Sequence, residues 1–172
     1  MALPMTRLLI AVFVLVSMSS PVFSAHLKPW EMYERLEIAS KANDAGDFST
    51  ALQELRPLSE DGFAPAQYLL GWMYRNGTGV LQDYEAALQL FRLGSAQEDA
   101  LAQVSLGSMY KEGIGVTQDY VLAHMWYNIA SSLGEERGKY AREAVAEMMS
   151  HSDISAAQRL ARECLDKSYK GC

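Results

Sequence analysis

The 172-residue sequence predicts an all-α fold, a short α/α solenoid in which helix pairs stack on one another. Two observations predict it: one stretch occurs twice, and each copy holds two helical segments separated by a glycine turn. The stretch LGWMYRNGTGVLQDY, from Leu70, returns as LGSMYKEGIGVTQDY from Leu106, an offset of 36 residues. Residues 63–98 and 99–134 share 15 identical positions at this offset, spread along the whole unit. A fixed period of this size is typical of stacked helical repeats.

Residues 1–24 have the layout of a secretory signal peptide. Arg7 is their only charged residue, Leu8–Val16 is an apolar run, and Pro21 follows it. The run is far shorter than the roughly 20 residues that a spanning helix needs. We therefore expect cleavage before Ala25, or one residue later, and an exported protein that is periplasmic or secreted. An uncleaved membrane anchor is the alternative.

The charge of the chain disfavours a nucleic-acid partner without excluding one. The formal net charge is -6, and it becomes -7 without residues 1–24, because 14 basic and 21 acidic residues remain. Such a chain offers no broad basic field to displace phosphate counterions.

The first unit after the signal, residues 25–62, is predicted to be a degenerate helix pair. Its first helix should cover Glu31–Ala45, with an apolar face at helical spacing and Gly46 as a left-handed C-terminal residue. Asp47 should cap a second helix that ends near Ser59. The apolar face expected on the first helix consists of Tyr33, Leu36 and either Ala39 or Ser40.

Residues 63–98 and 99–134 are predicted to be two full repeats. In the first, a helix over Ala64–Arg75 should end at Gly77, and Asp83 should cap a second helix over Tyr84–Ala96. Gly71 should allow close helix approach. The residues expected to build the repeats are Leu70, Gly71, Tyr74, Gly77, Gly79, Asp83 and Ala87, with Leu106, Gly107, Tyr110, Gly113, Gly115, Asp119 and Ala123.

Residues 135–172 are predicted to be capping helices. One helix should cover Glu136–Met149, and Ser152 should cap the last. Cys164 and Cys172 are separated by seven residues, and in an oxidising compartment they are expected to form a disulfide. The alternative is a buried Cys164 and a free Cys172.

A helical wheel of the first repeat helix separates two faces. Positions identical in both copies occupy one half-circle, as packing at every repeat requires, and differing positions occupy the other. Aromatic residues at unconstrained positions suit a protein-binding surface. The alternative is that the preceding helix pair covers them. The candidate contact residues are Tyr68, Leu69, Trp72 and Arg75, with Leu101, Val104 and Ser108 in the next unit.

The pattern A-x3-L-G-x2-Y-x2-G-x-G-V-x2-D-x3-A occurs at Ala66–Ala87 and again at Ala102–Ala123. It resembles the Sel1-like repeat, an α/α unit related to tetratricopeptide repeats. The resemblance implies a right-handed solenoid that acts as an adaptor for other proteins. The chain departs from the pattern at Gly94-Ser95-Ala96, where Ala-Ala is usual, and at Glu98, where a glycine ends the unit.

No catalytic pattern emerges from the sequence. His26, His124 and His151 are far apart and form no metal-ligand spacing, so His124 is interpreted as structural. The glycine turns lack a P-loop lysine and follow helices, which favours capping. The acidic pairs Glu98-Asp99 and Glu135-Glu136 are interpreted as solvated turn residues.

We therefore expect a non-enzymatic adaptor, without cofactor or metal, that binds another protein or an extended peptide through its concave helical face. The alternative is a secreted repeat-type hydrolase, β-lactamase-like or peptidoglycan-active, because some secreted cysteine-rich repeat proteins have been linked to such ligands.

Overall fold

The computed structural model describes residues 27–169 and 171–172, and this part of the chain forms eight α-helices. The expected signal peptide lies outside the described residues. No helix in the described part is long and apolar enough to cross a membrane. The helices are α1 (Pro29–Asp44), α2 (Phe48–Glu60), α3 (Ala64–Asn76), α4 (Tyr84–Ser95), α5 (Ala100–Glu112), α6 (Tyr120–Ser132), α7 (Glu136–Ala146) and α8 (His151–Asp166).

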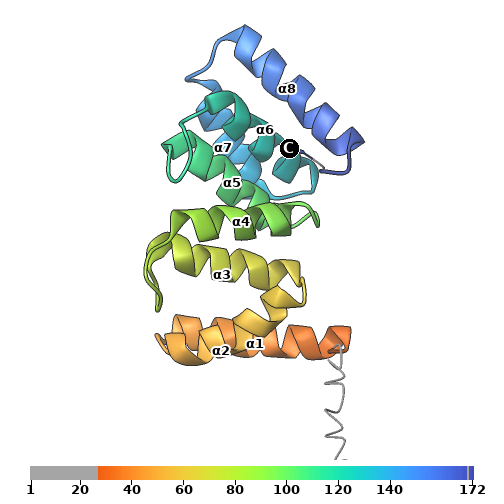
Figure 1. The fold of residues 1–172 in the computed structure, drawn as a ribbon. Coiled ribbons are helices and arrows are strands. Elements are labelled where there is room, and N and C mark those ends of the chain that lie inside the picture. The colour runs from red at the N-terminus through yellow and green to blue at the C-terminus, as the bar shows by residue number, and fades with distance from the viewer. Residues whose placement is uncertain (1–26, 170) are drawn as a thin grey trace, which may run out of the picture.

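Each helix packs mainly against its neighbours in sequence, so the pairs follow one another along one axis, from α1 and α2 at one end to α8 at the other (Figure 1). Among the odd-numbered helices, α5 also touches α3 on one side and α7 on the other. These three helices form, with α1, a surface that we call the first-helix face. Helix α8 leaves the alternation and packs across α6, where it closes the array. The molecule is therefore an α/α solenoid, as the sequence predicts.

The two glycine turns have the geometry that the sequence predicts. Gly77 and Gly113 end α3 and α5 with φ of 68° and 69°, in the left-handed region where a residue with Cβ is disfavoured. Asp83 and Asp119 then cap α4 and α6 by accepting hydrogen bonds from backbone amides. Local chemistry alone thus fixes where these helices end and begin.

Gly71 and Gly107 allow the two helices of each repeat to approach closely. A Cβ on Gly71 would lie 2.8 Å from Cε1 of Phe91, and one on Gly107 would lie 2.5 Å from Cε1 of Tyr127. Both rings are fully buried in the core. The close approach expected from the sequence is confirmed, and its cause is an aromatic ring of the second helix lying against the glycine.

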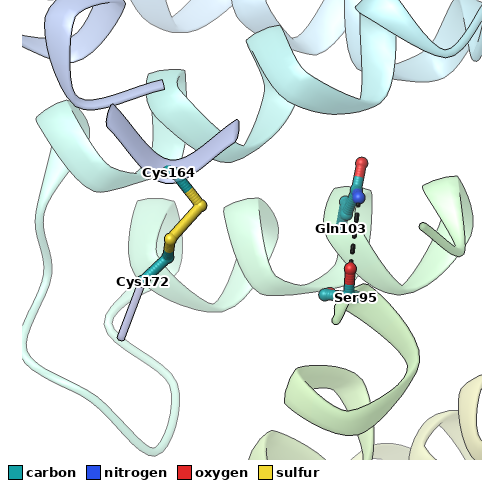
Figure 2. The surroundings of a disulfide bond; sticks show 4 residues. All are labelled: Ser95, Gln103, Cys164 and Cys172. Carbon is teal, nitrogen blue, oxygen red and sulfur yellow. Dashed lines mark hydrogen bonds between the residues drawn. A yellow bond between two sulfur atoms is a disulfide. The ribbon is translucent and has the colours of Figure 1, made fainter. Parts of the chain in front are cut away.

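Contacts between successive units were not foreseen from the sequence. The buried Gln67 side chain donates to the carbonyl of Ser59, at 3.3 Å, and Gln103 donates to the carbonyl of Ser95, at 3.4 Å (Figure 2). Each glutamine thereby adds a second hydrogen bond to a carbonyl at the end of the preceding helix, which already accepts one from the backbone amide of Gly62 or Glu98. The signal was available, because the serine and the glutamine each recur at an offset of 36 residues.

Three details at the ends of the array differ from expectation. Tyr33 is 60% exposed, whereas Ala39 on the same helix is fully buried, so Tyr33 does not belong to the buried face of α1. Helix α7 ends at Ala146, before Met149. The last helix is capped by Ser150, because its backbone is extended and its hydroxyl accepts from the amide of Asp153. Ser152 lies in the first turn instead.

The C-terminal segment turns back on α8. Cys164 and Cys172 have their Cα atoms 5.7 Å apart and their sulfur atoms joined (Figure 2). The reversal uses left-handed backbone at Ser168, Tyr169 and Gly171, with φ of 49°, 64° and 76°. This arrangement fits the expected pairing of the two cysteines.

Candidate protein-interaction face

The candidate contact residues of α3 lie along the first-helix face. Three of the candidates, Tyr68, Trp72 and Arg75, follow one another at spacings of three or four residues and form one line on the helix surface. Pro65, which is not one of the candidates, lies at the start of the same line. Trp72 is 38% exposed. Tyr68 is half-buried, with its ring centroid 6.3 Å from that of Phe91. The aromatic part of the line therefore has one residue facing solvent and one fixed against the core.

The other candidates are less accessible. Leu69 packs against the core of the first units, and Val104 against the core of the later ones. Leu101 is half-buried, and Ser108 accepts a hydrogen bond of 3.1 Å from the hydroxyl of Tyr127. Ser108 therefore supports the α5–α6 contact. Trp72 is the most exposed member of the predicted set, and contact with a partner stays a prediction.

An ion pair crosses the face beyond Trp72. The guanidinium of Arg75 on α3 lies 2.6 Å from the carboxylate of Glu112 on α5. Both side chains are partly exposed, so the pair contributes at most about 1 kcal/mol to stability. Its main effect is to hold the ends of two successive first helices together.

The opposite end of the face is acidic. Asp99 caps α5 by accepting from the amide of Ala102, and it is half-buried. Burial raises the pKa of the Asp99 carboxyl, and the charge of Glu135 adds to the rise. Our interpretation of Asp99 as a solvated turn residue was wrong, because the packed turns on either side remove it partly from water. Burial also raises the pKa of Tyr68 beside it, against the charge of Arg137.

A hollow of about 490 Å³ opens at this acidic end, where the turns before α3 and α5 meet the first turn of α1. One wall carries the rings of Tyr33 and Phe63, edge to face with centroids 5.1 Å apart. Asp61, Glu98 and Asp99 also line it. This hollow could not be predicted from the sequence, because its lining residues come from three separate segments of the chain.

His124 on α6 is a buried polar residue within the second repeat. It is 3% exposed, and its Nδ1 atom has no hydrogen-bond partner among the described residues. Desolvation lowers its pKa, and the charge of Arg142 lowers it further. The corresponding residue of the first repeat is Leu88, which is also buried. The interpretation of His124 as a structural residue agrees with this environment.

His124 should make the stability of the protein depend on pH. Because its pKa is lower in the folded state, the unfolded chain binds more protons below the ordinary value of about 6.5. The stabilisation is therefore complete above that pH and decreases as the pH falls through the lowered folded-state pKa. We expect His124→Leu to remove this loss of stability between pH 7 and 5. The substitution should also raise the free energy of unfolding by about 1 kcal/mol at pH 7, because it replaces an unpaired polar atom. Urea unfolding at several pH values measures both effects; an unchanged pH dependence in the variant would contradict the assignment.

Residues that could hold a metal do not gather in the described part of the chain: no group of three His, Cys, Asp or Glu side chains is suitably placed there. His124 is buried and His151 is exposed at the start of α8, while His26 lies outside the described residues.

Stacked helix pairs with short capped turns define the class of this protein as an α/α-solenoid repeat protein. The sequence model of the Sel1 repeat matches residues 64–99 and 100–135, one residue later than the units inferred from the sequence. A Sel1 repeat protein from Oxalobacter formigenes is 30% identical and has a TM-score of 0.58, over 66% of this chain and 89% of that one. The chain belongs to the Sel1 repeat family.

A second solved structure supports the fold alone. A protective antigen present in uropathogenic Escherichia coli strains, which displays an SLR fold, aligns with a TM-score of 0.74 at 23% identity. The alignment covers 80% of this chain but 31% of the antigen, so this chain spans about a third of that protein's length. No curated protein matches the chain in sequence.

Proposed function

We propose that this chain is an exported, non-enzymatic interaction protein that binds another protein, or an extended peptide, through its first-helix face. The observation that carries the proposal is Trp72. This residue is exposed on α3, at a position where the second repeat has Ser108, so repeat packing does not require it. Large aromatic residues at such positions are frequent hot spots of protein interfaces. Sel1 repeats generally mediate protein–protein interaction, which agrees with this assignment.

The scaffold under Trp72 favours binding because it is fixed in advance. Tyr68 is held against Phe91, and the Arg75–Glu112 pair ties α3 to α5. A surface whose side chains are already ordered loses less conformational entropy when a partner binds. The first-helix face is therefore suited to present a rigid aromatic line without a cofactor.

Export is the second part of the proposal. Its support is the apolar N-terminal run with Arg7 before it, and the position of Cys164 beside Cys172, which suits a disulfide in an oxidising compartment. Mass analysis of the protein isolated from the producing cell tests this part. A chain that begins at Ala25 or His26 would support it, and an intact N-terminus would contradict it.

Substitution of Trp72 tests the binding face. We expect Trp72→Ala to weaken capture of the partner at least tenfold, because it removes a large exposed contact, while the melting temperature changes little. Leu93→Ala is the matched control, since Leu93 is an exposed apolar residue on the second helix α4. A photo-crosslinking residue at position 72, with another at position 93, identifies the partner in the producing cell.

Three results would contradict the proposal. Equal crosslinking at both positions would remove the distinction between the faces. A large fall in melting temperature with Trp72→Ala would make the residue structural. Turnover of a β-lactam or of muropeptides by the purified protein would contradict its non-enzymatic part.

A further inference from the structure

The hollow at the acidic end of the first-helix face combines two kinds of wall. Tyr33 and Phe63 form an aromatic wall, and Tyr33 is largely exposed. Three acidic residues, Asp61, Glu98 and Asp99, also line the hollow. Aromatic faces and carboxylates both attract cations, and the apolar rings also accommodate an aliphatic side chain. Its volume of about 490 Å³ is sufficient for a long side chain.

The negative charge of the hollow is not balanced from within. In the described part of the chain, Asp61, Glu98 and Asp99 form no ion pair. Arg137, on the neighbouring helix α7, pairs with Glu135, 3.7 Å away. Asp99 is half-buried, and a carboxylate that is partly removed from water gains most from a cation placed beside it. The face is therefore complementary to a positively charged group of a partner.

Glu98 is held in a conformation that a glycine would adopt more easily. Its φ is 65°, and the corresponding residues of the neighbouring units are Gly62 and Gly134, with φ of 85° and 90°. A residue with a Cβ is disfavoured in the left-handed region, and such strain is often found at functional positions. Gly62 and Glu98 both line the hollow, so the chain carries a carboxylate, rather than the unstrained glycine, at one of the two turns that form it.

The hollow is continuous with the proposed binding face. Pro65 lines it and is also the first residue of the line that continues through Tyr68 to Trp72. An extended segment that crosses Trp72 along α3 therefore reaches the hollow about two helical turns further on.

We propose that the hollow receives a lysine or arginine side chain from an extended segment of the partner protein. The cationic end of that side chain would lie against Glu98 and Asp99, and its aliphatic stem against Tyr33 and Phe63. This inference rests on the proposed function, because the segment is the one that crosses Trp72. It adds the chemistry of the partner, which should carry a basic residue near the residue that contacts Trp72. The two partner residues should be separated by a distance equal to about two turns of α3.

Three peptides test this specificity with the protein expressed from its whole sequence and isolated as the host cell leaves it. Each is a twelve-residue Gly-Ser peptide in which the two central residues are replaced. They are both lysine in the first peptide, both norleucine in the second and both glutamate in the third. NMR titration of the ¹⁵N-labelled protein should show shifts at the hollow with the lysine peptide. We expect it to bind at least threefold more tightly than the norleucine peptide at low salt, with a smaller difference at high salt. The glutamate peptide should leave the hollow unperturbed.

Glu98→Gly separates binding from stability. It removes a carboxylate and also relieves the backbone, so we expect weaker binding of the lysine peptide, about threefold to tenfold, with a melting temperature about 2 °C higher. Glu98→Gln removes the charge but keeps the backbone strain, and it should weaken binding equally. Glu147→Gln is the control, because Glu147 is an exposed carboxylate at the far end of α7, and it should change neither quantity.

Several outcomes would overturn the inference: no perturbation of the hollow by the lysine peptide, equal binding of all three peptides, or unchanged affinity in both Glu98 variants. Self-association that these variants abolish would assign the face to a second copy of the chain. If Trp72→Ala loses the partner but the Glu98 variants do not, this inference fails and the proposed function stands. If the lysine peptide binds the hollow but position 72 crosslinks to nothing, the proposed function fails, whereas the preference of the hollow for a cation stands.

Discussion

Replacing Gly107 by alanine is expected to lower the free energy of unfolding by about 2–3 kcal/mol. The added Cβ would lie 2.5 Å from Cε1 and 2.6 Å from Cδ1 of Tyr127. The ring is fully buried, and its hydroxyl is bonded to Ser108, so it has no free space into which to move. Overpacking of this kind costs more than the roughly 1 kcal/mol that alanine gains over glycine inside a helix. Urea unfolding followed by circular dichroism measures the change.

A double-mutant cycle identifies the ring as the cause. Tyr127→Leu removes the atoms that the new Cβ would meet, so Gly107→Ala should cost at least 1 kcal/mol less in that background than in the natural chain. Gly94→Ala is a second comparison, since Gly94 is also helical but its added Cβ would lie 3.0 Å from Cβ of Ala102. Its effect should be smaller. Equal costs in both backgrounds would contradict the explanation.

Those parts of the fold that depend on local chemistry could be predicted from the sequence. A glycine at the end of an apolar helix pattern, as at Gly77, and an aspartate before the next pattern, as at Asp83, specify the two ends of a turn whatever surrounds them. The offset of 36 residues then transfers each assignment to the second repeat. The last helix shows the limit of this reasoning, because Ser150 and Ser152 are both suitable caps and only the backbone conformation distinguishes them.

Those parts that depend on contacts between units could not be read from single positions. Ser59 and Gln67 both recur at the repeat offset, but the recurrence alone does not show that the glutamine side chain bonds to the backbone carbonyl of the serine. Asp99 lies in a segment with the composition of a surface turn, yet packing of the neighbouring turns makes it half-buried, and this burial raises the pKa of its carboxyl. In both cases the decisive neighbour comes from another unit of the solenoid.

The candidate site, like the fold, could be predicted from the sequence only in part. Comparing the two copies of the first helix selected the half that contains Trp72, because packing leaves that half free to vary. Comparing the two copies does not reveal how far each variable side chain is buried. Ser108 differs from Trp72 at the corresponding position because it meets the hydroxyl of Tyr127, where the first repeat has Phe91 without a hydroxyl.

Gly79 links one repeat to the preceding unit, and its replacement by alanine is expected to cost about 3 kcal/mol. Its φ is 71°, so alanine carries a backbone penalty of roughly 1 kcal/mol. The added Cβ would also collide with Cβ of Phe48, the first residue of α2. Because that atom is attached directly to the helix backbone, the collision requires α2 and the glycine turn to move apart, which adds about 2 kcal/mol. The contact joins two units, so this glycine is required by packing between units as well as by its own turn.

Gly62→Ala separates the two contributions to this cost. Gly62 has a φ of 85°, and an added Cβ there would have no atom within 4 Å. Its replacement should therefore cost only the backbone penalty of about 1 kcal/mol. Thermal unfolding of both variants measures the difference, which we attribute to packing between α2 and the turn after α3. Hydrogen exchange should also become faster in α1 and α2 of the Gly79 variant, since these helices would lose their attachment to the rest of the array. Equal destabilisation by the two substitutions would mean that backbone conformation alone selects glycine at this position.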